Sequence, residues 1–258
     1  MAKLRKLANR TKELEIFLQM AQGNHDCRIM LIEGESGMGK TSLLSRFRQQ
    51  CPDEVKYVPF DCKGSNSILA FLSQVADYLG RVQFPTFVKQ LRTFGQGSVD
   101  FSENDIAAEK ISIAIYGNNL DSEAQEYRSQ QLQTAFFHDL ERFEHQIVIA
   151  LDTYQMANES LRDWIESTWL RTVERRLKKV VTVVAGQSIP DPNHLVWANE
   201  CTHFILTPIL DEKAWYEFCS DLPEYCELPE LAVKAIALVA EGHPLNVNQM
   251  LSFAAKKW

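Results

Sequence analysis

The chain has 258 residues, of which 45% are hydrophobic and 24% are charged, and its formal net charge is −7. This length is enough for one large α/β domain with a smaller companion, and the composition is that of an ordinary globular protein. The acidic balance disfavours a nucleic acid partner, because the molecule as a whole would repel a phosphate backbone.

No apolar stretch approaches the length of a membrane span, and the first residues lack the apolar core of a signal peptide. We therefore expect a cytoplasmic protein with no membrane partner. The six cysteines contain no C-x-x-C pair, so we expect buried, reduced thiols and not a zinc site.

The N-terminal part of the chain contains the most informative motif. An amphipathic segment from Asn9 to Leu18 predicts a helix, and the apolar run Ile29–Ile32 predicts a buried strand. Directly after this strand, residues 34–41 fit the phosphate-binding pattern G-x-x-x-x-G-K-[ST]. The glycines of such a loop let successive N–H groups point at phosphate oxygens, and the helix that follows adds its positive end.

This loop predicts a nucleoside triphosphate as the ligand. Lys40 is expected to reach the β- and γ-phosphates, and Thr41 is expected to hold Mg²⁺. Because no pattern typical of guanine recognition is present, ATP and ADP are favoured over GTP. The predicted nucleotide-binding residues of the loop are Gly34, Ser36, Gly37, Met38, Gly39, Lys40, Thr41 and Ser42.

The pattern of strand and helix continues after the loop and is then interrupted. Residues 55–60 predict a second strand, and residues 68–80 predict a helix. Residues 81–126 contain a proline, several glycines and paired asparagines, so we expect an insertion there, with a small hairpin around residues 111–118. Helical periodicity returns from Tyr127 to Phe143.

The apolar run Ile147–Leu151 ends in Asp152, which is typical of a central buried strand with an acid at its carboxyl edge. In a phosphate-loop ATPase such an acid orients Mg²⁺ and its water shell. With Lys40 and Thr41 in the same chain, this role is favoured over that of an ordinary turn residue. Asp152 and Thr41 are therefore the predicted metal ligands.

The remaining elements complete a sheet and add a helical unit. A helix over residues 159–177 leads to a strand over 180–185, which Gln187 follows at a position where its side chain is expected near the γ-phosphate. A last strand is expected over residues 203–206. Alternating strands and helices predict a parallel sheet with helical crossovers.

Helices are predicted beyond the sheet over residues 212–220, 229–240 and 244–257. We predict that they form a compact lid on the nucleotide side of the sheet. The domain organisation is then a nucleotide-binding α/β domain over residues 1–208 and a helical lid domain over residues 209–258.

A basic cluster allows two interpretations. It is either a solvated helix face, which is favoured, or a functional positive patch. Its residues are Arg171, Arg175, Arg176, Lys178 and Lys179.

Together these segments resemble one family, the STAND class of signal-transduction ATPases within the AAA+ group, which includes the NACHT and NB-ARC domains. The segment Asn9–Leu14 is similar to the family motif that lies over adenine, and this resemblance makes Arg10 a nucleotide-binding residue. The segment Gly242–Leu245 is similar to the G-x-P motif, whose proline, here Pro244, packs beside the base. The resemblance implies ATP or ADP with Mg²⁺ as ligands and oligomerisation on ATP binding.

The chain departs from the family pattern where catalysis depends on it. Thr153 follows Asp152 where many members carry a second acid that activates water. Gln155 and Gln187 stand where the family often has glutamate and arginine. Because glutamine orients water without accepting its proton, we expect Lys40, Asp152, Gln155 and Gln187 to support only weak hydrolysis of ATP to ADP and phosphate.

Three functions are consistent with these patterns. The first is an ATP/ADP switch of a signalling or defence system, which acts on a partner or effector chain; an arginine of the basic cluster is then a candidate arginine finger. The second is a DNA-associated AAA+ adaptor that uses the basic cluster. The third is a pseudo-ATPase in which nucleotide only stabilises an interaction module. Relatives usually carry further modules after the lid, so the chain is either a fragment of a longer switch or a standalone module.

Overall fold

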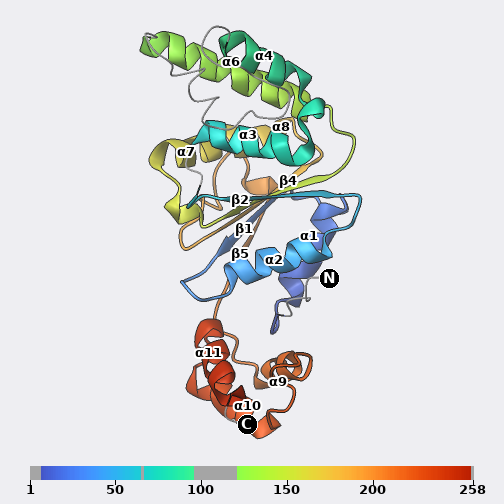
Figure 1. Cartoon of the computed structure of the whole chain (residues 1–258), viewed down its shortest axis with the longest axis vertical. Coiled ribbons are helices and arrows are strands. Elements are labelled where there is room, and N and C mark those ends of the chain that lie inside the picture. The colour runs from blue at the N-terminus through green and yellow to red at the C-terminus, as the bar shows by residue number, and fades with distance from the viewer. Residues whose placement is uncertain (1–6, 65–66, 96–120, 257–258) are drawn as a thin grey trace.

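The computed structural model describes residues 7–64, 67–95 and 121–256. A five-stranded sheet lies at the centre, with helices on both faces, and a helical lid lies at one end of the long axis (Figure 1). All neighbouring strands are parallel, in the order β2-β3-β4-β1-β5. The predicted α/β class, with a parallel sheet flanked by helices and a helical lid, is confirmed. The strands are β1 Ile29–Glu33, β2 Lys56–Asp61, β3 Ile147–Asp152, β4 Val180–Gly186 and β5 Cys201–Ile205.

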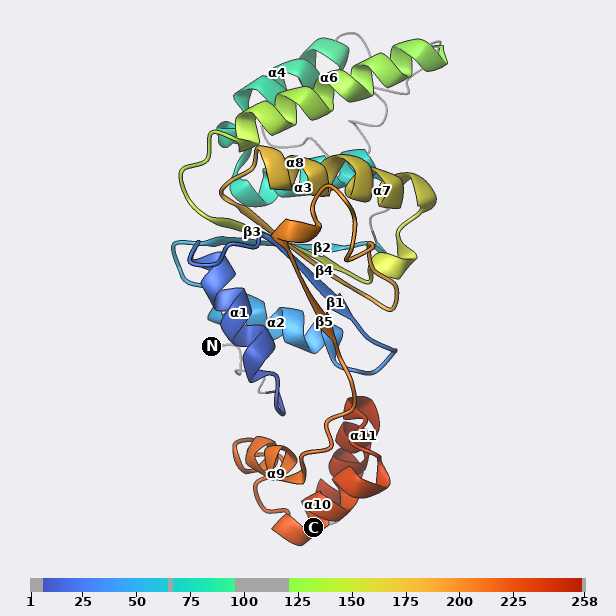
Figure 2. The same cartoon turned by 180° about the vertical axis from the view of Figure 1, so that it is seen from behind.

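The inner strands β1, β3 and β4 are apolar and buried on both faces, because helices cover both faces of the sheet. Figures 1 and 2 show α1 (Thr11–Ala21) and α2 (Lys40–Gln50) on one side. On the other side lie α3 (Ile68–Leu79), α7 (Glu159–Trp164) and α8 (Leu170–Arg175). Side chains alternate along each strand, so the odd and even positions of β1 enter different apolar clusters.

The cluster on the α3 side is rich in aromatic rings. Phe71 contacts Trp169 edge to face, with ring centroids 4.8 Å apart. Thr182 lies fully buried in β4, and its hydroxyl accepts a hydrogen bond of 3.1 Å from the indole N–H of Trp169. The tryptophans of the 159–177 segment therefore pack in the core, and the buried threonine has the partner that burial requires.

The segment predicted as one helix over residues 159–177 has a wider turn in its middle. Residues Ile165–Trp169 form a π-helical turn, η3, between α7 and α8. Trp164 and Trp169 are five residues apart, an interval that a regular α-helix places on different faces. The wider turn brings both indoles into the same cluster, with centroids 6.0 Å apart.

The predicted insertion over residues 81–126 contains a helix that the sequence reasoning missed. A short 3₁₀ turn, η1 (Arg81–Gln83), leads to α4 (Pro85–Gly95). Proline was interpreted as a break, but it stands at the first position of α4, where its missing N–H costs nothing. The predicted hairpin over residues 111–118 lies outside the described residues.

The helix α4 packs along α6 (Ser122–Leu140), and the two lie at the end of the molecule opposite the lid (Figure 2). The helix α6 begins five residues before its predicted start at Tyr127, because Asp121 accepts a hydrogen bond from the backbone N–H of Ala124 and caps it. The buried carboxylate of Asp139 accepts a 2.8 Å hydrogen bond from the N–H of Phe87 in the first turn of α4. This contact between the helices holds the start of α4 on α6.

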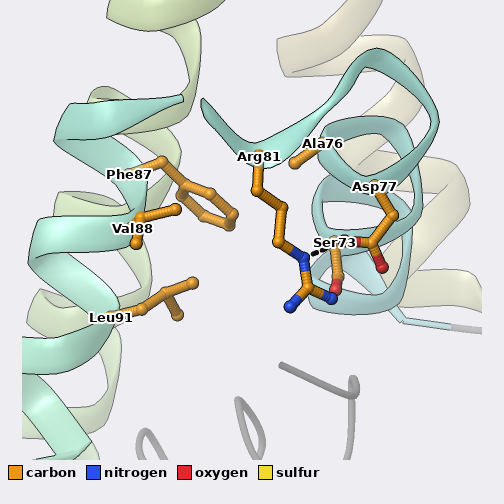
Figure 3. A pocket seen from close by; sticks show the side chains of 7 residues that line it. All are labelled: Ser73, Ala76, Asp77, Arg81, Phe87, Val88 and Leu91. Atoms are coloured by element: carbon orange, nitrogen blue, oxygen red, sulfur yellow. Dashed lines mark hydrogen bonds and ion pairs between the residues drawn. The ribbon is translucent and has the colours of Figure 1, made fainter. Parts of the chain in front are cut away.

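A small hollow lies between α3, η1 and α4, where Arg81 forms an ion pair with Asp77 (Figure 3). Its volume of about 10 Å³ is sufficient for about one water molecule and not for a nucleotide. Three apolar side chains of α4 face this ion pair, Phe87, Val88 and Leu91.

The lid consists of α9 (Glu212–Ser220), α10 (Glu230–Val239) and α11 (Pro244–Ala255), within two residues of the predicted bounds. These helices share an apolar cluster separate from the two clusters of the sheet. Ala8 of the N-terminal segment also joins this cluster, and the domain boundary between residues 208 and 209 stays a prediction.

The cysteines are more exposed than predicted. All six are free thiols, but only Cys62 and Cys219 are buried, and Cys226 is exposed. Burial raises the pKa of Cys62 to about 12. This thiol therefore stays protonated near neutral pH.

Candidate nucleotide-binding site

A cleft of about 1160 Å³ lies between the carboxyl end of the sheet and the lid. It is lined by the glycine-rich loop after β1, the segment after β3 and the lid helices. Gly34 is the one predicted site residue that does not line it. The predicted residues that do are Arg10, Ser36, Gly37, Met38, Gly39, Lys40, Thr41, Ser42, Asp152, Gln155, Gln187 and Pro244.

The backbone of the loop has the conformation that a phosphate cradle needs. Gly37 and Gly39 have φ values of +84° and +88°, in the left-handed region that side chains disfavour. Gly39 is the N-cap residue of α2, so the N–H groups of Lys40, Thr41 and Ser42 have no intrahelical acceptor. The positive end of α2 therefore faces the cleft and is suited to a phosphate group.

The ammonium group of Lys40 lies over the same loop. Its Nζ donates hydrogen bonds of 2.6 Å to the carbonyl oxygen of Gly34 and 2.8 Å to that of Glu35. Burial lowers the pKa of Lys40, while the negative charge of Asp152 acts in the opposite direction. Gly34 thus contributes a carbonyl that anchors Lys40, although it does not line the cleft.

The oxygen ligands that Mg²⁺ prefers come from two elements that line the cleft. Thr41 lies in the first turn of α2, and Asp152 is the last residue of β3. A hydroxyl and a carboxylate are hard ligands, so these residues fit the metal. The chain turns sharply after Asp152, because Thr153 adopts φ 58° and its N–H donates a 2.8 Å hydrogen bond to Asp152 Oδ1.

The two glutamines predicted at the site lie together. The backbone N–H of Gln187, at the end of β4, donates a 3.0 Å hydrogen bond to Oε1 of Gln155, which lies in the 3₁₀ turn η2 (Tyr154–Met156). Gly186 is needed here, since a Cβ would lie 3.1 Å from the same Oε1 and would collide with the carbonyl oxygen of Ser188. Gln155 therefore connects the ends of β3 and β4, a role that sequence spacing did not reveal.

The N-terminal segment and the lid complete the cleft. The guanidinium of Arg10 donates a 2.8 Å hydrogen bond to the carbonyl oxygen of Thr207, where the chain leaves the sheet for the lid. Burial lowers the pKa of Arg10, and Glu13 at 3.6 Å counteracts this effect. From the lid, Pro244 begins α11, and the N–H of Leu245 donates a 3.2 Å hydrogen bond to the carbonyl oxygen of Gly37.

A comparison with protein families supports the same assignment of the loop. The family described as AAA ATPase domain matches residues 6–183. The chain belongs to this family. Membership implies nucleotide binding, and the matched residues include the phosphate loop and β3.

Solved structures share the fold of this AAA ATPase domain. A Walker-type ATPase of Pyrococcus abyssi is 14% identical, with a TM-score of 0.51, over 96% of this chain and 68% of that one. Cdc6p from Pyrobaculum aerophilum is 15% identical, with a TM-score of 0.57, over 99% of this chain and 64% of that one. The Aeropyrum pernix Orc1 protein, solved in complex with DNA, is 14% identical, with a TM-score of 0.47, over 98% of this chain and 61% of that one.

The chain thus spans about two thirds of the length of these structures. The likeness to the first two is one of fold. No curated protein matches the sequence. Within the described parts of the chain, no helix has the length and apolar character of a membrane span.

The sequence reasoning missed a group of aromatic residues in the lid. Trp215 and Phe218, three residues apart on α9, line the cleft, and their rings meet edge to face with centroids 5.7 Å apart. Tyr225 also lines it and is held by a 2.8 Å hydrogen bond with Ser252. Aromatic residues at helical spacing were a usable signal for an apolar lining of the cleft. Trp215 and Tyr225 are buried in the lid cluster, so Phe218 offers the more accessible ring.

Two carboxylates at the ends of neighbouring strands, Glu33 and Asp61, do not line the cleft. Glu33 lies 3.2 Å from His203, and Oδ1 of Asp61 accepts a hydrogen bond from the N–H of Lys63. Within the described part of the chain, the carboxylate residues lining the cleft are Asp152 and Glu224.

The basic cluster lies on α8 and the turn after it, where its side chains are exposed. Glutamates balance part of its charge. Arg175 lies 3.5 Å from Glu174, and Arg176 forms an ion pair with Glu141. This arrangement is typical of a solvated helix face, the interpretation that the sequence favoured.

Proposed function

We propose that the protein is an ATP/ADP-dependent switch ATPase of the STAND type, which works in a signalling or defence system. The observation that carries this proposal is the shared cleft. One cavity is lined by the phosphate loop and by the lid, and a hydrogen bond from Leu245 to Gly37 joins the two directly. A nucleotide held there contacts both parts and thereby sets their relative position.

The residues of the cleft divide the recognition of the nucleotide among them. The N–H groups at the start of α2 and the ammonium of Lys40 bind phosphate oxygens, and Thr41 with Asp152 would hold Mg²⁺. When bound, Mg²⁺ neutralises charge on the phosphate groups. Pro244, the segment around Arg10 and the aromatic residues of α9 form the surface for the base.

Hydrolysis is proposed to be slow because the residues that follow Asp152 in the cleft are poor bases. Thr153 stands directly after Asp152, and its hydroxyl is a poor proton acceptor. The Oε1 atom of Gln155 accepts the hydrogen bond from Gln187. A slow enzyme suits a switch, since the triphosphate state then persists long enough for a partner or effector chain to bind.

The switch is tested by comparing the protein in MgATP and in MgADP. Amide hydrogen exchange reports the mobility of α11 and the loop over residues 34–39, and light scattering reports the oligomeric state. We expect different exchange in the two nucleotides, and a larger oligomer in MgATP alone. Identical exchange and identical mass in both nucleotides, with binding demonstrated, would overturn the switch.

The same samples test two other functions. Sustained binding without turnover supports a pseudo-ATPase, which the threonine after Asp152 favours. Binding to duplex DNA that weakens with salt, and disappears when Arg171 and Lys179 are replaced by alanine, supports a DNA-associated adaptor, since both residues are exposed.

A further inference from the structure

The lid touches the phosphate loop at Gly37, and the contact leaves no room for a side chain. A Cβ atom at Gly37 would lie 2.5 Å from Cε1 of His243 and 3.0 Å from Cβ of Leu245. His243 itself does not line the nucleotide cleft. We infer that His243 is a positioning residue, which holds the phosphate loop in its binding conformation from outside the cleft.

Gly39 provides the comparison that isolates this contact. Its φ of +88° is nearly the same as the +84° of Gly37, but a Cβ atom at Gly39 would meet nothing within 4 Å. The backbone conformation therefore explains glycine at position 39. At position 37 the lid adds a second requirement, because the ring of His243 occupies the space of a side chain.

His243 is itself held firmly by the lid. It is the N-cap residue of α11, and its carbonyl oxygen accepts a 2.9 Å hydrogen bond from the N–H of Val247. Gly242 before it accepts a 2.9 Å hydrogen bond from the N–H of Ile209, and any side chain at position 242 would collide with the backbone of Ile209. The backbone that carries the ring is therefore fixed by the start of α11 and by the chain that leads into the lid.

The ring acts by packing. Its Nδ1 atom is buried and has no hydrogen-bond partner among the described residues. A purely apolar ring of similar shape would satisfy the same contact without an unpaired buried nitrogen.

The contact fixes one peptide group of the loop. The carbonyl oxygen of Gly37 accepts the 3.2 Å hydrogen bond from Leu245, while the N–H of Met38, in the same peptide group, points to the carbonyl oxygen of Glu35 at 3.3 Å. If the lid moves away, this peptide group loses its outer partner and the loop loosens. Lid position and nucleotide affinity are then coupled, and the coupling is reciprocal. This coupling rests on the proposed nucleotide site, whereas the contact between His243 and Gly37 is independent of that site.

The contact is tested first without nucleotide, by amide hydrogen exchange and thermal unfolding. The proteins compared are Gly37→Ala, Gly39→Ala and His243→Ala, and the two double variants that combine His243→Ala with each glycine substitution. We expect faster exchange in residues 243–247 for Gly37→Ala than for Gly39→Ala. Adding His243→Ala should partly restore slow exchange in the Gly37→Ala protein and should not do so in the Gly39→Ala protein. Equal effects of the two glycine variants, or no rescue by His243→Ala, would overturn the inference.

The coupling is tested with MgADP and with a second variant that avoids any folding defect at Gly37. His243→Ala should weaken MgADP binding on the order of tenfold. His243→Phe, which keeps the ring, should bind like the wild type. MgADP should slow exchange in residues 243–247 of the wild type and not in His243→Ala. Equal affinity in all three proteins would overturn the positioning role. No binding by the wild type would instead contradict the nucleotide site, and the exchange result without nucleotide would still decide the contact.

Discussion

Lys40 lines the cleft within the phosphate loop, and its environment is expected to set a pH limit on binding. Burial lowers its pKa below the usual value of 10.5, so the ammonium loses its proton earlier on the alkaline side than an exposed lysine does. Nucleotide affinity should be constant near neutral pH and fall as the pH rises through this lowered pKa. The folded protein holds the proton of Lys40 less tightly than the unfolded chain does. The free energy of unfolding should therefore not fall as the pH rises through this range.

Titration of MgADP at a series of alkaline pH values measures this effect. Lys40→Arg provides the control, because guanidinium keeps its proton above pH ~12. Lys40→Arg is expected to bind MgADP more weakly than the wild type, but its affinity should not decline over the same pH range. A parallel decline in both proteins would assign the pH dependence to another group.

Gln155 is the residue whose role changed most between sequence and structure. Gln155→Ala removes the acceptor of the N–H of Gln187, so the end of β4 loses its connection to β3. We expect turnover to fall about tenfold with little change in MgADP affinity, because the phosphate contacts stay in place. Gln155→Glu keeps an acceptor oxygen and should retain turnover, measured as phosphate release. A Gln155→Ala protein with wild-type turnover would contradict this role.

At the scale of the elements, one buried carboxylate holds α4 on α6. Asp139→Ala removes the acceptor of the N–H of Phe87 and leaves that donor buried, which should cost about 1–2 kcal/mol of unfolding free energy. Urea unfolding measures this cost. Glu123→Ala in the exposed first turn of α6 is the control, with an expected change below about 0.5 kcal/mol. Equal effects of both substitutions would show that the hydrogen bond from Phe87 to Asp139 does not stabilise the packing of α4 on α6.

The elements that the sequence predicted well are those whose pattern has one physical explanation. The apolar runs ending at Ile32 and Asp152 match β1 and β3 because strands buried on both faces need continuous apolar residues. The phosphate loop was predictable because its glycines and lysine occur at fixed spacing. The start at Pro85 was missed because proline fits both a turn and the first residue of a helix.

Parts of the site depend on contacts that no spacing reveals. Arg10 was placed at the adenine by resemblance, and the structure gives it a backbone partner almost two hundred residues away, at Thr207. The aromatic residues of α9 reach the cleft only because the lid folds back on the loop. The π-helical turn accompanies the packing of two tryptophans in one cluster beside the sheet. The strands of that sheet come from distant parts of the chain, so the local sequence could not predict the turn.

For the whole molecule, Arg10 joins the N-terminal segment to the chain that leads into the lid. Arg10→Ala should free this junction and weaken MgADP binding on the order of tenfold, while amide exchange in α9 and α11 becomes faster. Lys12→Ala, on the exposed side of α1, is the matched control and should change neither the affinity for MgADP nor the amide exchange of α9 and α11. Weaker binding without faster exchange would place Arg10 at the nucleotide and not at the junction.

The proposed switch requires that the cleft binds an adenine nucleotide through the phosphate loop. Titration calorimetry of MgADP into the wild type and into Lys40→Ala tests this binding. We predict one site per chain in the wild type, and an affinity lower by on the order of tenfold to a hundredfold in Lys40→Ala, since a charged hydrogen-bonding group is removed from the phosphates. No binding by the wild type, or equal affinity in the two proteins, would contradict the claim.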